Sequence, residues 1–209
     1  MDLFDQNQIC NHSDGEGRYA YRMQPSMGVF AIQQLLSSLS VVLGFEIENK
    51  VAPKPMELVN SDPDQLEKWS KLAEETLGED IQKLFTSTLI HEWKKSWRSK
   101  LGLKEELEND QSEIIDPLLS VLEDLDFSSS IRRLSGFAGK VLEKKVGVDE
   151  LVKAFSENWY DEKSLPEFVR SLKRDSVVSW LKVYAGRLEK EGGDSEIVKK
   201  EMDQVSPTQ

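Results

Sequence analysis

The spacing of apolar residues constrains this chain more than any other feature, because these residues recur every three or four positions almost throughout. That period is typical of helices with one buried face, whereas runs that alternate apolar and polar residues, which indicate strands, are nearly absent. The clearest stripe lies in residues 26–43, after Pro25 and before Gly44, which is expected to end the helix. Its members are Met27, Phe30, Ala31, Leu35, Leu39, Val42 and Leu43. The sequence therefore predicts an all-α fold.

Local signals divide the rest of the chain into further helices. Asp62 followed by Pro63 is typical of a helix start, and it opens a long tract that is expected to reach about Leu103, with Gly78 and the Gly102 region as candidate breaks. Asp194 is expected to cap a last short helix. The helices between these two starts are expected at about 111–125, 128–145, 148–159 and 164–190.

Charge and cysteine content argue against several functions. The formal net charge of -11 disfavours nucleic acid or an anionic membrane as a partner, because both would repel the chain. The nearest approach to a membrane span is residues 29–43, shorter than the roughly 20 apolar residues that a span needs. The single Cys10 excludes an internal disulfide and a multi-cysteine zinc site. The first residues resemble neither a signal nor a transit peptide, so no targeting signal is expected on this chain.

Residues 1–25 form an irregular polar lead, rich in Asn, Asp, Gly and Ser, ahead of the helical region 26–209. Residues 15–20 have the G-x-G-x-x-A spacing of a dinucleotide-binding loop. That chemistry needs a strand before the glycines and a helix that begins at them. Here a polar stretch precedes the glycines and the helix is delayed until Pro25. A turn is therefore the favoured interpretation.

Neither histidine predicts a metal or nucleophilic site. His12 lies near Cys10 and Asp14, but zinc needs three or four convergent ligands, and these three stand in a turn-rich segment. His91 is followed by Lys95 at the position where a zincin helix needs its second histidine. A basic stretch nearby is interpreted as a solvated helix face rather than a phosphate-binding site. It consists of Lys94, Lys95, Arg98, Lys100 and Lys104.

Residues 9–25 closely resemble a signature of the selenoprotein O family, C-N-x-S-D-x-x-G-R-Y-x-[YF]-x-x-Q-P. The matching residues are Cys10, Asn11, Ser13, Asp14, Gly17, Arg18, Tyr19, Gln24 and Pro25. Shorter similarities follow in the family's order at residues 100–103, 126–135, 180–188 and 202–207. Two departures stand out: residues 30–32 replace the usual Trp-Asn-Leu, as in a fungal-type variant, and Ser206 replaces an asparagine.

The resemblance implies a protein adenylyltransferase with a pseudokinase fold, of which this chain would be the C-terminal helical lobe. Members transfer AMP from ATP to Ser, Thr or Tyr hydroxyls of protein substrates, with Mg²⁺, and the resemblance places the protein in mitochondria. The family's nucleotide- and metal-binding residues lie upstream of the signature, and relatives continue beyond the position of Gln209. The chain is therefore expected to be an inactive fragment with no catalytic, cofactor-binding or metal-binding residue and no cofactor of its own.

The same resemblance links Cys10 to a regulatory disulfide of some relatives, and its thiol is expected to be accessible. Self-association of the fragment is also expected, because the 26–43 helix carries apolar residues on two faces. Two alternatives stay open. One is a helical module that binds proteins without modifying them, and the other is an unrelated helical scaffold that shares the signature by coincidence.

Overall fold

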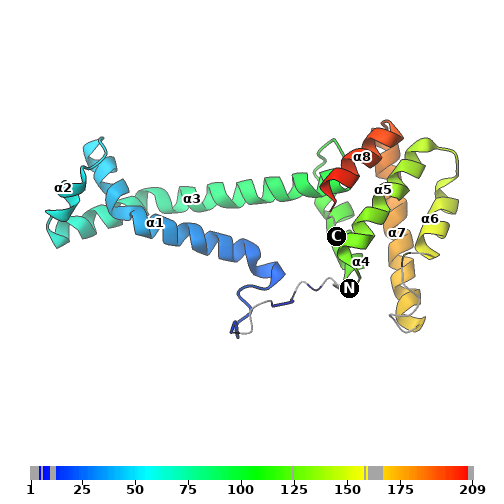
Figure 1. Ribbon diagram of the computed structural model, residues 1–209, viewed down its shortest axis with the longest axis horizontal. Coiled ribbons are helices and arrows are strands. Elements are labelled where there is room, and N and C mark those ends of the chain that lie inside the picture. The colour runs from blue at the N-terminus through cyan, green and yellow to red at the C-terminus, as the bar shows by residue number, and fades with distance from the viewer. Residues whose placement is uncertain are drawn as a thin grey trace. The chain divides into compact units, whose positions relative to one another are not determined.

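The computed structural model describes residues 5, 7–9, 13–123, 125–157, 159 and 167–206. This part of the chain is almost entirely helical and contains no β-strand, which confirms the predicted all-α fold (Figure 1). The chain divides into two compact units, residues 6–92 and residues 93–209, with residues 1–5 assigned to the second.

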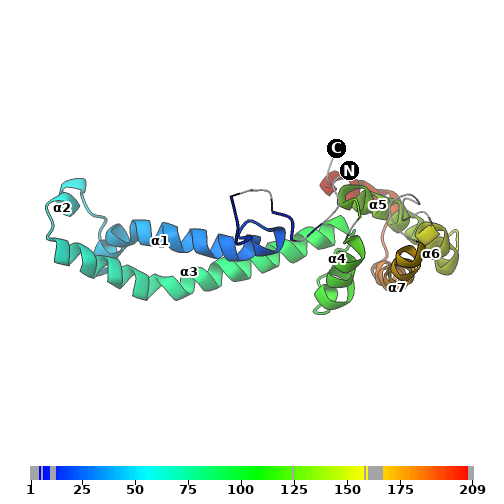
Figure 2. The same ribbon diagram turned by 90° about the horizontal axis from the view of Figure 1, so that it is seen from below.

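Two antiparallel helices make up most of the unit 6–92. They run alongside each other in Figure 2, and in Figure 1 they cross near the connection that joins them and diverge toward the N-terminal end of the first helix. α1 (Gln24–Asn49) follows the short 3-10 helix η1 (Tyr21–Met23), and α2 (Pro55–Val59) lies in the connection to α3 (Pro63–Lys100), whose last turns belong to the other unit. The Asp62 side chain accepts a hydrogen bond from the Asp64 amide at 2.9 Å. The predicted start of α3 is thereby confirmed.

Small residues let α1 and α3 approach closely. The buried residues of α1 are Leu36, Ser40 and Gly44, spaced four apart. The Ser40 and Ser70 hydroxyls are 2.7 Å apart, and a Cβ on Gly44 would lie 1.8 Å from the carbonyl oxygen of Trp69. The prediction that Gly44 ends the helix is therefore wrong. This glycine lies inside α1 because only a residue without a side chain fits against the α3 backbone.

The apolar stripe of this helix, which carries apolar residues on two faces, is largely exposed. Phe30, Leu35, Leu39 and Val42 keep 51%, 52%, 45% and 37% of their accessible surface. The helix pair forms instead along the small residues, because they allow the shorter distance between backbones. Gly78 does not break α3 either, since the helix passes through it and Leu36 packs nearby.

α1 is also more membrane-like than the sequence analysis predicted. Among the described residues, the continuous helix from Tyr21 to Asn49 is long and apolar enough to cross a membrane by length and composition alone, because an 18-residue window within it has a mean hydropathy of 1.6. The expectation that no segment approaches a membrane span is therefore corrected. Its polar Gln and Ser residues interrupt the apolar run but do not lower the average below that of a span.

The unit 93–209 packs its helices around one apolar core. The π-helix η2 (Gln111–Ile115) leads into α4 (Asp116–Leu122), followed by α5 (Phe127–Glu143), α6 (Val148–Glu157), α7 (Glu167–Glu191) and α8 (Ser195–Val205). α5 packs against α7 and α8, and α6 packs against α7. The rings of Trp180, Tyr184 and Phe137 stack in sequence at the centre, with centroids 4.9 Å and 6.0 Å apart.

Two of these helices begin at aspartates whose side chains accept amide groups of the first turn. Asp126 accepts the Ser129 amide at 2.9 Å, and Asp194 accepts two amides of the first turn of α8 at 3.0 Å. The prediction for Asp194 is confirmed. The tract expected to reach about Leu103 ends at Lys100, and the break predicted in the Gly102 region is confirmed. Gly102 adopts φ +66° and leaves no room for a Cβ beside Val198 and Met202.

Candidate functional site

The described part of the family signature is a turn that holds itself together. The Asp14 carboxylate accepts the Tyr19 amide at 2.8 Å, and the Ala20 amide donates to the Gly17 carbonyl at 3.1 Å. Gly17 has φ +69°, in the left-handed region that favours glycine. No helix begins at these glycines, because η1 starts only at Tyr21. The preference for a turn over a dinucleotide-binding loop is confirmed.

The charged groups of this turn pair with each other in solvent. The Arg18 guanidinium donates to the Glu16 carboxylate through Nη2 at 2.6 Å and Nε at 2.9 Å, and these hydrogen bonds to Glu16 raise the pKa of Arg18. The Tyr19 side chain is 52% exposed, and Ser13 is exposed as well. Gln24 and Pro25 form the first turn of α1. Of the predicted positions, Cys10 and Asn11 lie outside the described residues, as does His12.

Acid is expected to undo this turn locally. The hydrogen bond from the Tyr19 amide lowers the pKa of Asp14 below its ordinary value. A carboxylate whose pKa is lowered in the folded turn stabilises that turn fully at pH values above its ordinary pKa. This stabilisation is lost as the pH falls through the lowered pKa of the folded state. We expect the Tyr19 amide resonance to titrate with a midpoint below that of an ordinary aspartate. Asp14→Asn should abolish this titration, and Glu16→Gln should leave its midpoint unchanged. If the Tyr19 amide still titrates with the same midpoint in Asp14→Asn, Asp14 is not the group responsible.

Four side chains along one side of α7 hold the backbone of the segment between α3 and α4, and we call them the α7 ladder: Trp180, Tyr184, Arg187 and Glu191. Trp180 Nε1 donates to the Ile114 carbonyl at 2.8 Å, and the Tyr184 hydroxyl donates to the Leu101 carbonyl at 2.6 Å. Arg187 Nη2 donates to the Glu105 carbonyl at 2.9 Å, and Glu191 accepts the Lys104 amide at 2.7 Å. The ladder therefore fixes residues 101–114, which have little regular structure before η2.

A buried charge cluster lies at the C-terminal end of the ladder. Arg187 Nε is 3.3 Å from Asp110 Oδ1, and Nη1 is 2.5 Å from Glu191 Oε1, an ion pair without hydrogen-bond geometry. All three side chains are more than nine-tenths buried. Asp110 also accepts the Leu107 amide at 2.9 Å. One guanidinium therefore compensates two buried carboxylates, and burial raises the pKa of the neighbouring Tyr184, which stays a neutral donor.

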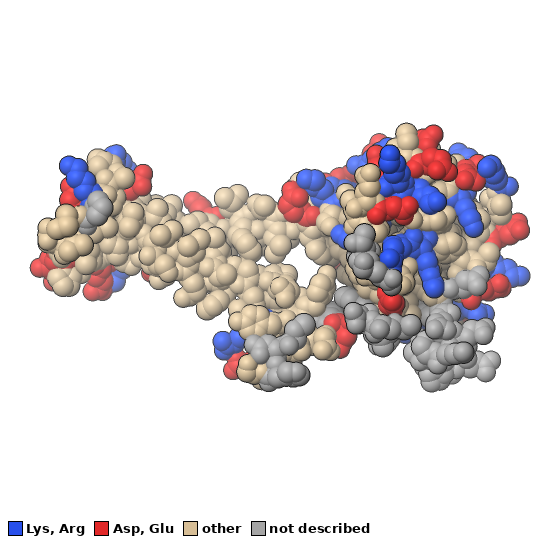
Figure 3. All heavy atoms as spheres, in the orientation of Figure 1, with Lys and Arg blue, Asp and Glu red and all other residues tan. Residues whose placement is uncertain are grey.

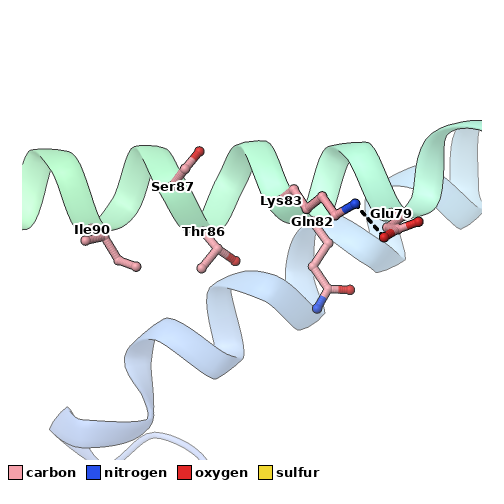
Figure 4. A pocket seen from close by; sticks show the side chains of 6 residues that line it. All are labelled: Glu79, Gln82, Lys83, Thr86, Ser87 and Ile90. Atoms are coloured by element: carbon pink, nitrogen blue, oxygen red, sulfur yellow. Dashed lines mark ion pairs between the residues drawn. The ribbon is translucent and has the colours of Figure 1, made fainter.

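Two hollows lined by described residues have charged groups that pair with each other. An opening of about 250 Å³ between η2 and α7 has Asp110 and Arg187 at its lining, already paired with each other. A shallow hollow along α3 is lined by Glu79, Gln82, Lys83, Thr86, Ser87 and Ile90 (Figure 4). There Lys83 pairs with Glu79 at 2.5 Å. In each hollow, therefore, one acidic and one basic side chain of the lining are paired with each other.

Among the described residues, no three His, Cys, Asp or Glu side chains are grouped so that they could hold a metal ion. His91 is 58% exposed, beside Glu92. The basic stretch is not uniformly solvated, which corrects that interpretation for Arg98. This side chain is only 8% exposed and its Nη2 lies 2.9 Å from Glu106. Lys100 lies over the Trp97 ring, 5.9 Å from its centroid, so the stretch does not present one phosphate-binding surface.

Comparison with known proteins agrees with the signature. Residues 1–209 match the family described as protein adenylyltransferase SelO. The chain is 28% identical over 209 residues to a protein nucleotidyltransferase YdiU of Burkholderia ambifaria, covering 99% of this chain and 33% of the relative. It is 34% identical over 136 residues to the YdiU of Methylococcus capsulatus, covering 64% of this chain and 22% of the relative.

The chain thus spans about a third of the length of the curated relatives that it matches. A match over all 209 residues also rules out the alternative of a signature shared by coincidence, because it includes the segments of the turn and of the α7 ladder. The chain belongs to the SelO family of protein adenylyltransferases.

Proposed function

We propose that this chain is the C-terminal helical lobe of a kinase-like protein adenylyltransferase, which moves AMP from ATP to Ser, Thr or Tyr hydroxyls of protein substrates. The observation that carries the proposal is the family match across residues 1–209. The order of the motifs supports the C-terminal placement, since the signature stands at the start of the chain and the family's nucleotide-binding residues precede it. By the same resemblance, we propose a mitochondrial location.

In this reaction a substrate hydroxyl oxygen bonds to the α-phosphorus of ATP, the bond to pyrophosphate breaks, and the hydroxyl gives up its proton. Catalysis of such transfers rests on positioning and charge stabilisation. The described residues of this chain do not fit an ATP–Mg²⁺ site, because no three possible metal ligands come together among them and the buried Arg187 is already paired with Asp110 and Glu191. No step is therefore assigned to them, and we propose that ATP and Mg²⁺ bind in the part of the longer relatives that this chain does not match.

Within such an enzyme, the residues of this chain would act as framework. The α7 ladder holds residues 101–114 by bonds to main-chain groups, and the signature turn sets the direction in which the chain enters α1. Cys10 remains a proposed redox-regulatory position. Reading the coding sequence upstream of Met1 tests the enzyme proposal directly. A Gly/Arg-rich strand pattern with an Asn and Asp metal pair would support it, and a different domain there would overturn it.

The chain alone is expected to show no saturable binding of ATP–Mg²⁺ by isothermal titration calorimetry, because its paired charges and net charge of -11 offer no phosphate site. The full-length Burkholderia ambifaria relative is the positive control. A one-to-one isotherm with micromolar affinity for the 209-residue chain would contradict the proposal that nucleotide binding lies elsewhere.

A helical module that binds proteins without modifying them is the second candidate, and the exposed apolar residues of α1 favour it. The two candidates differ in one measurement. When purified chain is added to the catalytic part of a relative that lacks this region, recovery of AMP transfer to a protein substrate supports the enzyme lobe. Binding without recovery supports the module.

A further inference from the structure

No further inference is drawn: the strongest candidate, the exposed apolar face of α1 with Leu35, Leu39 and Val42 in an uncharged stretch of surface (Figure 3), is an unpartnered face of a chain that spans about a third of its relatives, and nothing among the described residues shows what covers it.

Discussion

Gly44→Ala is expected to destabilise the α1–α3 pair by about 3 kcal/mol or more, at the upper end for overpacked sites. The added Cβ would lie 1.8 Å from the carbonyl oxygen of Trp69 and 2.4 Å from its carbonyl carbon. These are backbone atoms inside a helix, so the two helices must move apart rather than a side chain rotate. Helix separation would also disturb the Ser40–Ser70 hydroxyl contact and the Trp69 indole bond to Glu48.

Urea unfolding followed by circular dichroism measures this change, with hydrogen exchange of α1 amides to locate it. Gly136→Ala is the matched control, because nothing lies within 4 Å of a Cβ at that position inside α5. It should stabilise the protein by about 0.5–1 kcal/mol through helix propensity. If Gly44→Ala behaves like Gly136→Ala, the close approach of α1 and α3 is not as described.

Arg187→Met is expected to lower the free energy of unfolding by about 3–5 kcal/mol, because it leaves Asp110 and Glu191 buried without their cation. The change also removes the donor to the Glu105 carbonyl. We expect a lower midpoint of urea unfolding and faster hydrogen exchange in residues 101–114. The effect should appear in that segment because the α7 ladder holds it by individual side chains rather than by regular secondary structure.

Lys182→Met is the control on the same helix. Its ion pair with Asp149 at 2.8 Å lies in solvent, with both side chains more than half exposed, so its loss should change stability little. Arg187→Lys keeps the charge but loses the branched donor group. Its loss of stability should therefore lie between those of Lys182→Met and Arg187→Met. Wild-type exchange rates in residues 101–114 of Arg187→Met would show that the ladder does not position this segment.

The helical fold and the family could be read from the sequence because both rest on local or contiguous signals. The caps at Asp62 and Asp194 depend on residues two or three positions away, and the period of apolar residues specifies helix whatever the neighbours are. The signature turn is equally local, since Asp14, Gly17 and Tyr19 complete it among themselves. Such features need no knowledge of which helices meet.

The tertiary structure decided which faces of the helices are covered. The sequence marks Leu35 and Leu39 as apolar, but α3 packs on Leu36, Ser40 and Gly44, since closeness of the two backbones depends on small residues in both helices. A glycine that ends a helix and one that admits a neighbouring backbone look alike in a single sequence. For this reason the sequence predicts a helix end at Gly44, where the structure has a helix contact. The α7 ladder joins positions 66 to 87 residues apart. Of its contacts, only the ion pair of Arg187 and Glu191 has a spacing, i and i+4, that can be recognised in the sequence. Asp110 becomes a partner of Arg187 only when η2 and α7 pack together, because that contact is fixed by the path of the chain and not by the spacing of its residues.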